Sequence, residues 1–368
     1  MPKSADGRNL ALDLDLSEKM TRAAQELVHN KFQLDLVTSS RNTKMLARDL
    51  HGGGYGPHEG PCFLSMVVPF YKAGDRIEKY EFALVPTAHT LGCSWKWWHR
   101  ELDQDEVNRR AEELSSTNSL LAETLNPATY TWIKALGLIA PGEGKNRVDF
   151  FRQAGIESIP AKVYQRDYPA PERIELYRVK KEGFDETWAV LDRRWVQKVA
   201  HPSWAVPLLE AYGVALEERW PSVYPAPEKI QLSFFERPGD TSPNGCPDIP
   251  GDDPTIDMDT LKARDKYQHE EIPCTVFEMK HTKINPLLLK LGGTGVVVGL
   301  LSLCVAPSSW MEYKVAAGML LGCSFMALIM PYTVPFITTQ RRNVAKQLPI
   351  DVERAPKYQA QSVERYLG

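Results

Sequence analysis

Histidine and cysteine are the residues of this 368-residue chain with the most scope for metal binding or nucleophilic chemistry. The eight histidines show neither the His-x-x-x-His nor the His-Glu-x-x-His spacing that places two ligands on one helix face. The six cysteines form no Cys-x-x-Cys pair, and Cys304 and Cys323 lie inside apolar stretches. The pattern argues against a zinc site and a disulfide framework, and it predicts reduced, structural thiols.

Two glycine-rich segments contain partial catalytic motifs. His51–Gly52–Gly53–Gly54 is similar to the oxyanion loop of lipases and esterases, but the chain has no Gly-x-Ser-x-Gly elbow for a nucleophile. Gly142–Glu143–Gly144–Lys145 is similar to part of a phosphate loop, yet Ile139 and Asn146 stand where that motif needs a glycine and a hydroxyl. The sequence therefore predicts no catalytic residue, no cofactor-binding residue and no metal ligand.

Two apolar stretches lie late in the chain, Pro286 to Val305 and Val315 to Pro335, and each is about 20 residues long. About 20 residues at a rise of 1.5 Å match the hydrocarbon core of a bilayer. Pro307–Ser309 predicts a short turn between them, so we expect a transmembrane helical hairpin. Two buried helices of a large soluble core are the alternative. Against it, the only charge in the two stretches is Lys290, which is near enough to an end to snorkel.

Aromatic and basic residues flank the two stretches. Trp310 and Tyr313 on one side and Tyr332 on the other stand where aromatic rings prefer the headgroup level of a membrane. The turn has only Glu312 and Lys314, whereas the outer ends are basic, with Lys280, His281, Lys283, Arg341, Arg342 and Lys346. Positive residues stay on the cytosolic or matrix side, so both termini are expected on that side.

Glycines recur at helical spacing in both stretches. Gly295 and Gly299 fall on one face of the first predicted helix, and Gly318 and Gly322 fall on one face of the second. Such faces let another backbone approach closely, which favours helix association in lipid. We expect helix packing at these four glycines, either between the two arms of the hairpin or with a neighbouring subunit.

An internal repeat marks the soluble region. The segment Tyr168 to Leu176 returns about 56 residues later as Tyr224 to Leu232, and both copies begin Tyr-Pro-Ala-Pro-Glu. Upstream, Gly155–Ile156 corresponds to Gly213–Val214. Each copy predicts a helix that ends at glycine, a short connection, a rigid Pro-x-Pro segment and a strand. The expected fold class is an α+β soluble region with an internal repeat of about 56 residues, followed by the two-helix transmembrane hairpin.

The remaining pattern divides the chain into five predicted parts. The first, residues 1–127, is an N-terminal α+β region in which we expect a helix from Asp15 through about Lys31, an antiparallel pair of strands (Phe63 to Tyr71 and Lys79 to Val85) and a long helix from Asp103. The others are the pseudo-repeat region 128–237, an acidic linker rich in proline and glycine at 238–284, the hairpin at 285–340 and a polar C-terminal tail at 341–368.

Charge and targeting signals narrow the range of functions expected for this chain. A net charge of −3 gives no basic field for nucleic acid. Met1 to Asp15 has no apolar signal-peptide core and is too acidic for a cleavable organellar presequence. We therefore expect a non-catalytic accessory structural subunit of a mitochondrial inner-membrane complex, a respiratory-chain complex or the ATP synthase, with both termini in the matrix. The expected partners are the other subunits and membrane lipids.

Two other classes of function stay open at this point. One is a membrane-anchored enzyme whose site lies between the glycine-rich loop at 51–60 and the tryptophan cluster at 95–98. The other is a lipid-handling or transport protein, which is weakened because neither apolar stretch has an ionisable group in its interior. The location also has an alternative, another internal membrane with both termini in the cytosol.

Overall fold

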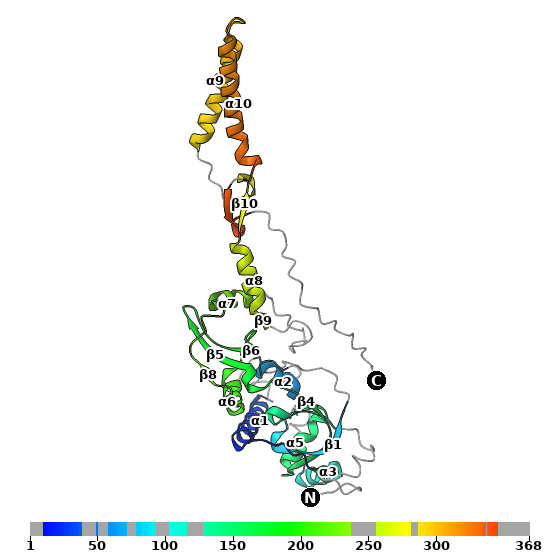
Figure 1. Ribbon diagram of the computed structural model, residues 1–368. Coiled ribbons are helices and arrows are strands. Elements are labelled where there is room, and N and C mark those ends of the chain that lie inside the picture. The colour runs from blue at the N-terminus through cyan, green and yellow to red at the C-terminus, as the bar shows by residue number, and fades with distance from the viewer. Residues whose placement is uncertain are drawn as a thin grey trace. The chain divides into compact units, whose positions relative to one another are not determined.

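The structure, a computed structural model, has a mixed α+β architecture (Figure 1). It describes residues 10–38, 49–50, 58–71, 79–92, 103–115, 128–236, 255–280, 286–335 and 337–344. Residues up to Met258 form one compact unit, the first unit, and residues from Asp259 form another, the second unit. The five predicted parts remain predictions in their boundaries. Residues 255–280 of the predicted linker, however, form regular structure, since they contain two strands and a helix.

The first unit contains a four-stranded sheet with the order β1-β4-β2-β3. Its strands are β1 (Glu81–Pro86), β2 (Thr129–Ile133), β3 (Leu138–Glu143) and β4 (Ser158–Arg166). β2 pairs antiparallel with β3 and parallel with β4, and helix α5 (Lys145–Gln153) makes the crossover between β3 and β4. Val107 of α3 (Gln104–Leu114) and Phe151 of α5 pack on one face of this sheet, against Tyr130 and Ile159.

A second, five-stranded sheet has the order β8-β5-β6-β7-β9. Its strands are β5 (Ile174–Lys181), β6 (Phe184–Leu191), β7 (Trp195–Lys198), β8 (Leu216–Glu217) and β9 (Thr255–Asp257). Residues of β5 alternate between its faces. Leu176 joins the main core, whereas Tyr177 contacts the Trp220 ring on the opposite face, at 5.1 Å between ring centroids. Helix α7 (Pro227–Glu236) contributes Phe234 to the same aromatic group, 5.9 Å from the Trp188 ring.

The main core of the first unit brings three helices together with both sheets. These helices are α1 (Glu18–Thr38), α2 (Gly60–Val67) and α6 (Pro202–Tyr212). Their buried residues Leu27, Phe63 and Leu208 belong to one cluster with residues of β3 and β5. The expected helix after Asp15 is confirmed, and it extends to Thr38, with its buried face continuing past Lys31 to Asp35 and Thr38.

The expected antiparallel pair of strands over Phe63 to Tyr71 and Lys79 to Val85 is wrong. The second segment forms β1, but β1 pairs with β4, and Gly60–Val67 is the helix α2. Pro61 lies at the start of this helix, where its fixed φ and missing N–H are tolerated. Phe63, Leu64 and Val67 are all buried in the core. This is the spacing of a helix face and not the alternation of buried and exposed residues expected for a strand.

The two copies of the sequence repeat share a beginning and then differ in structure. The upstream glycines both follow a helix and have positive φ, +67° at Gly155 and +108° at Gly213. The Pro-x-Pro segments also start alike, because Arg173 N–H donates to Ala170 O at 3.0 Å and Lys229 N–H donates to Ala226 O at 2.9 Å. The first copy then continues as strand β5.

The second copy continues as helix α7, so the strand expected there is wrong. Ile230 and Phe234, one helical turn apart, both face the second sheet, where Ile230 is fully buried and Phe234 contacts Trp188. Gln231 also reaches the second sheet, where its Nε2 donates to Glu186 Oε1 of β6 at 3.2 Å. A helix allows Gln231 and Phe234, three residues apart, to share this side, whereas a strand would point them to opposite sides. The prediction therefore holds for the local turn and fails for the element that follows it.

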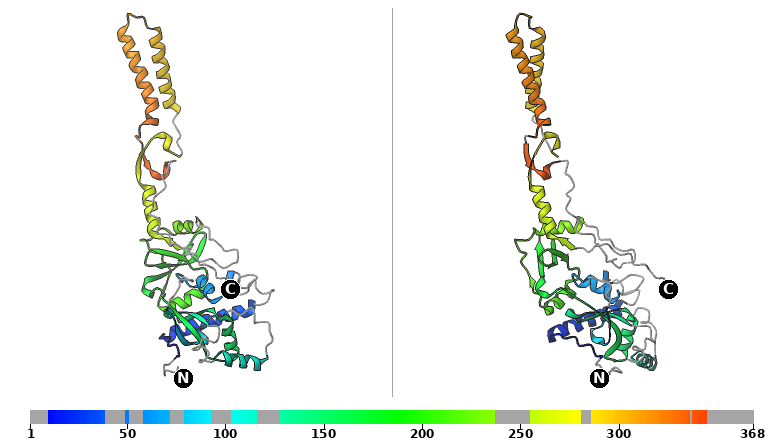
Figure 2. Two further views of the ribbon diagram at one scale, coloured as in Figure 1. Left: turned by 90° about the vertical axis from the view of Figure 1, so that its right-hand side faces the viewer. Right: turned by 45° about the vertical axis from the view of Figure 1, so that its right-hand side comes forward.

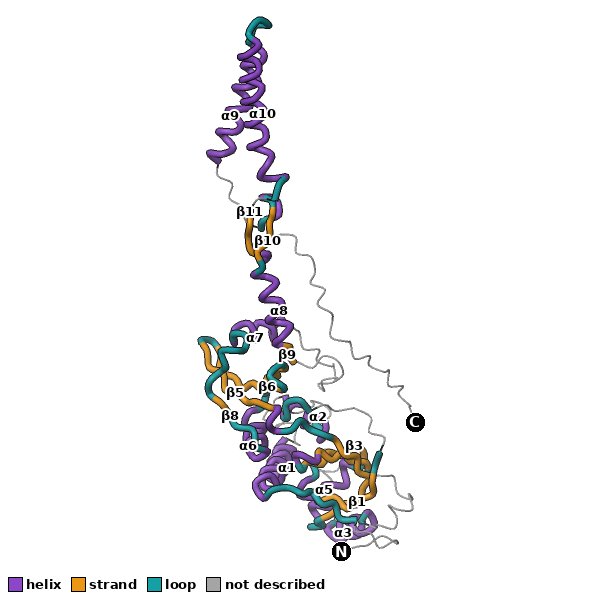
Figure 3. The backbone as a smooth tube through the Cα atoms, in the orientation of Figure 1, coloured by secondary structure: helices purple, strands orange, loops and turns teal. Residues whose placement is uncertain are grey.

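The second unit contains helix α8 (Met258–His269), a two-stranded ribbon and two apolar helices. The ribbon pairs β10 (Glu271–Cys274) antiparallel with β11 (Ile337–Gln340), and Figure 3 shows the two strands side by side. Between these strands in sequence lie α9 (Pro286–Val305) and α10 (Met311–Thr333). Figure 2 shows α9 and α10 side by side in both of its views.

Candidate functional site: an apolar helix pair and a buried ionic cluster

The α9–α10 pair leaves most of its apolar surface uncovered. The exposed large apolar side chains of the pair are Leu287, Leu289, Leu291, Val297, Val298, Leu300, Leu301, Val305, Met311, Val315, Met319, Leu320, Phe325, Met326 and Met330. Burying one such side chain fully is worth roughly 1.5–3 kcal/mol, so this surface is costly in water. Contiguous exposed apolar surface on this scale marks a site that contacts a membrane or another protein.

Only one helix in the described part of the chain is long and apolar enough to cross a membrane, and that helix is α10. Only 6% of its most apolar window is buried within the protein. In α9 the apolar part is the shorter segment Leu289–Val305. The whole helix α9 has 20 residues and spans roughly 30 Å at 1.5 Å per residue, which is close to the usual hydrocarbon thickness. The sequence predicted two spans of equal length. The structure has one clear candidate for a span, α10, beside the shorter apolar helix α9.

The two helices contact each other through a strip of glycines on α9. A Cβ atom at Gly292 would lie 2.6 Å from Leu328 Cδ2, and one at Gly299 would lie 3.0 Å from the Leu321 backbone nitrogen. Gly295 lies between them and contacts Ser324. Each step along α9 is matched by a step back along α10, so the pair is antiparallel. Gly292 was not among the predicted packing residues, although its spacing of three from Gly295 was the available signal.

The two predicted glycines of α10 lie in a different environment. A Cβ atom at Gly318 or Gly322 would meet nothing within 4 Å, so neither glycine faces α9. The residues of α10 that face the glycine strip are Leu321, Ser324 and Leu328. The structure therefore brings Gly295 and Gly299 to the contact between the helices and leaves Gly318 and Gly322 on an open face. A packing role for all four glycines stays a prediction.

Aromatic side chains lie near both ends of the helix pair. Trp310 and Tyr313 are exposed beside the turn, with ring centroids 6.0 Å apart. At the opposite end the Tyr332 ring lies 4.5 Å from the Phe277 ring. Tyr313 and Tyr332 are roughly 29 Å apart along α10 at 1.5 Å per residue, which is close to the hydrocarbon thickness. Their role at the membrane interface stays a prediction.

A buried ionic cluster joins α1 to α5 in the first unit. On α1, Lys31 Nζ donates to Asp35 Oδ1, and the side chains of the two residues are only 1% and 3% exposed. On α5, Arg152 Nη1 lies 3.8 Å from Asp149 Oδ1, and Arg152 also donates to the Thr90 carbonyl. Within the described residues, neither carboxylate oxygen of Asp149 accepts a hydrogen bond. Lys31 and Asp35 continue the stripe of buried residues of α1, and that spacing could have revealed them.

Burial shifts the acidic groups of this cluster toward neutral pH. Removal from water raises the pKa of Asp149 to about 7, although the nearby Arg152 opposes the shift. The same effect raises the pKa of Asp35 to about 6, against the opposing charge of Lys31. Burial disfavours the charged form of a carboxyl group, which explains the direction of both shifts. The cluster can therefore take up protons between about pH 5 and pH 7.

A cysteine and a histidine lie within hydrogen-bonding distance at the start of α2. Cys62 Sγ is 3.4 Å from His58 Nδ1, and His58 Nε2 is 2.9 Å from the Asp49 carbonyl oxygen. A carbonyl only accepts, so Nε2 carries the proton and Nδ1 is left as the acceptor for the thiol. Burial lowers the pKa of His58, which favours the neutral ring. The arrangement matches a thiol nucleophile next to a general base.

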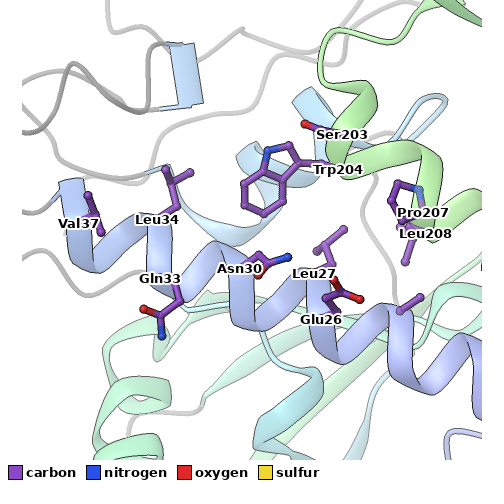
Figure 4. Close-up of a pocket in the computed structure, with 11 residues that line it drawn as sticks. Glu26, Leu27, Asn30, Gln33, Leu34, Val37, Ser203, Trp204, Pro207 and Leu208 are labelled. Atoms are coloured by element: carbon purple, nitrogen blue, oxygen red, sulfur yellow. The ribbon is translucent and has the colours of Figure 1, made fainter.

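An apolar groove of about 450 Å³ lies between α1 and α6 (Figure 4). Leu27, Trp204 and Leu208 line it, and Glu26 and Asn30 add polar atoms. Its volume lies within the range of small-ligand pockets, but nothing in it selects one class of ligand. The predicted enzyme site falls largely on 51–57 and 95–98, which lie outside the described residues.

No group of three or more histidine, cysteine, aspartate or glutamate side chains among the described residues could hold a metal ion. No protein family, curated protein or solved structure matches the chain. The proposals that follow therefore rest on the geometry of the two units and on their surfaces.

Proposed function

We propose that this chain is a membrane-anchored accessory subunit of a membrane protein complex. In this proposal the α9–α10 pair is a transmembrane hairpin, and the first unit binds other subunits outside the bilayer. The observation that carries the proposal is the apolar surface of α9 and α10, which is exposed on nearly all sides of the pair. Such a surface is stable in lipid, where the backbone hydrogen bonds of both helices are satisfied internally.

A second exposed apolar surface, on the first unit, supports the proposal that this chain binds other subunits. Val223, Leu232 and Phe235 are all more than half exposed, and Phe235 reaches 75%. Leu232 and Phe235 are three residues apart on α7 and therefore share a face of this helix. Large apolar side chains grouped on a soluble surface are typical of protein contacts. We assign this surface, the α7 patch, to a contact with another subunit.

For the membrane itself we propose the mitochondrial inner membrane, within a respiratory-chain complex or the ATP synthase, and this choice rests on the sequence pattern alone. The orientation places both termini in the matrix. It is supported by exposed basic residues near the ribbon, Lys280 and Arg342, where positive residues stay on the matrix side. Subcellular fractionation tests the location. Protease added from the matrix side should cut both the first unit and the tail after Arg341.

The experiment separates anchoring from assembly. Tagged full-length protein is isolated from native membranes with mild detergent, and the proteins that migrate with it on native gels are identified. We expect a stoichiometric complex and resistance to extraction by alkaline carbonate. The double variant Leu232→Asp/Phe235→Asp should stay in the membrane but lose the complex. Ser233→Asp, a control that adds charge to the same helix at an exposed hydroxyl, should keep it.

Two outcomes contradict parts of this proposal. Release of the unmodified protein by alkaline carbonate would show that α9 and α10 do not span a bilayer. Migration as a lone monomer from native membranes would contradict the accessory-subunit role, whatever the anchor does.

A membrane-anchored thiol enzyme is the second candidate, because His58 and Cys62 form a hydrogen-bonded pair. In an acyl transfer, the Cys62 thiol would give its proton to His58 Nδ1 while Sγ attacks an acyl carbonyl. The leaving group would take that proton from Nδ1 as the thioester forms, and water would then hydrolyse the thioester.

Acyl ester and thioester substrates test this second function on the purified full-length protein. Cys62→Ser should abolish any turnover, and His58→Gln should lower it by about 100-fold or more. Cys274→Ser is the matched control, because burial raises the pKa of the Cys274 thiol and keeps it protonated. Equal turnover in all three variants would exclude the pair as the catalytic site.

A further inference from the structure

The ribbon of the second unit continues into short turns on both sides, and together these segments form a small module next to the helix pair. We call this the ribbon module: β10, the turn η6 (Val276–Glu278), β11 and the turn η7 (Arg341–Asn343). Glu271 pairs with Gln340 and Cys274 pairs with Ile337. Beyond the strands, Lys280 N–H donates to the Asn343 carbonyl at 2.8 Å, so the two chain segments also stay together past the ribbon.

Phe277 lies on the surface of this module and is 72% exposed. The turn that presents it is fixed by a capping box, in which Glu278 Oε2 accepts from Thr275 N–H at 2.8 Å and from Thr275 Oγ1 at 3.0 Å. A rigid turn therefore holds a large aromatic ring in an exposed position. Exposure of this ring to water is unfavourable, because burying it would gain roughly 1.5–3 kcal/mol.

The depth of Phe277 relative to the helix pair follows from its contact with Tyr332. The two ring centroids are 4.5 Å apart, and Tyr332 lies in the last turn of α10. Once α10 spans a bilayer, Tyr332 is at the headgroup level, and Phe277 must be at nearly the same level. Aromatic rings are enriched at that level of a membrane.

Exposed basic side chains follow the turn that presents Phe277. Lys280 follows the turn η6 directly and Arg342 lies in η7, and both are exposed. Lys290, also exposed, lies about one turn into α9, close enough for its amine to reach the interface. Two acidic groups are engaged locally: Glu278 caps the turn, and Glu270, just before β10, accepts from Arg341 Nη2 at 2.7 Å. Glu271 of β10 is exposed. The module thus presents an exposed aromatic ring and, three residues later, an exposed lysine.

We propose that the ribbon module binds the headgroup layer of a bilayer rich in anionic phospholipid, with Phe277 inserted beside Tyr332 and with Lys280 facing lipid phosphates. This inference rests on the proposed membrane span of α10 and adds a second attachment to it. The ring gains burial among lipid chains near the headgroups, and the lysine gains attraction to the anionic surface.

Site-specific photocrosslinking tests the proposal on the full-length protein in vesicles of phosphatidylcholine with and without anionic phospholipid. The photoreactive residue p-benzoylphenylalanine replaces Phe277, Leu301 or Phe235, one position at a time. Leu301 is an exposed residue of α9 and reports the span, while Phe235 belongs to the α7 patch of the first unit. We expect lipid adducts at positions 277 and 301 and none at 235.

The charge dependence provides the second readout. Adducts at position 277 should fall about fivefold when Lys280→Glu is added or when the anionic lipid is omitted, whereas adducts at 301 should not change. Lipid adducts at 301 without any at 277 would overturn this inference and leave the span intact. Absence of adducts at 301 would instead overturn the span itself. Adducts that join position 277 to a second copy of the protein would overturn the proposed lipid contact of the ribbon module, since the ring would then face protein.

Discussion

Replacing Asp149 by asparagine should change how the stability of the first unit depends on pH. The carboxylate of Asp149 belongs to α5 and is buried within the ionic cluster, and within the described residues its oxygens accept no hydrogen bond. Burial raises its pKa from 3.8 to about 7, so the folded protein holds a proton there that the unfolded chain has already lost above pH 4. Asparagine has nearly the same shape and does not titrate.

The sign and the size follow from this shift. Between about pH 4 and pH 7 the folded state binds one more proton than the unfolded state, so the free energy of unfolding falls as pH rises. Each pH unit costs about 1.4 kcal/mol well below pH 7 and less near it, so the loss is about 2.6 kcal/mol between pH 5 and pH 8, where it is nearly complete. Asp149→Asn should remove this loss. Asp35, whose pKa is raised to about 6, adds its own loss in both proteins and largely cancels in the comparison.

The assay is urea unfolding of the full-length protein in detergent at pH 5, 6, 7 and 8, followed by tryptophan fluorescence. The difference in unfolding free energy between Asp149→Asn and the unmodified protein should grow by about 2.6 kcal/mol from pH 5 to pH 8. Asp185→Asn is the control, because Arg178 holds the pKa of the exposed Asp185 below its usual value and this carboxyl does not titrate in that range. A constant difference for Asp149→Asn from pH 5 to pH 8 would refute the reasoning.

Three further changes test other parts of the structure. Gly299→Leu should speed hydrogen exchange of the α10 amides in detergent, because its side chain meets the α10 backbone, whereas Gly318→Leu should leave exchange unchanged; equal rates would show that the glycine strip does not hold the pair. Lys31→Met should cost about 3–5 kcal/mol in urea unfolding by leaving Asp35 buried and unpaired, and adding Asp35→Leu should recover most of it. Gly213→Ala should lower the unfolding free energy by at least about 1 kcal/mol, because φ is +108° there; an unchanged midpoint would contradict this.

The apolar helices were the part of the fold that the sequence indicated best. A long apolar run needs no tertiary partner to become a helix, so α9 and α10 appear where Pro286 to Val305 and Val315 to Pro335 predicted them, with α10 starting earlier, at Met311. Which face of α10 meets α9 was not predictable from Gly318 and Gly322. Small residues permit close approach, but the register of the pair decides which of them is used, and Leu321, Ser324 and Leu328 face α9 instead.

Short segments of the first unit were predicted less well, for a physical reason. Runs such as Gly60–Val67 and Pro227–Glu236 contain enough apolar residues to bury one face either as a strand or as a helix. The choice depends on which neighbour is present, the main core for α2 and the Trp188 surface for α7. The cluster of Lys31 and Asp149 was missed for a similar reason, because residues far apart in sequence create the burial that shifts its titration.

The pairing of β10 with β11 sets the order in which the second unit can be completed during synthesis. β10 leaves the ribosome before α9 and α10, and its partner strand is made only after both helices. Until then the backbone groups of Glu271–Cys274 have no ribbon partner, and the chain on either side of the helices is free to separate. The ribbon can therefore close only after both helices have been made and Ile337–Gln340 lies beside Glu271–Cys274. A chain truncated before Ile337 would keep both apolar helices but would lack the strand that pairs with β10.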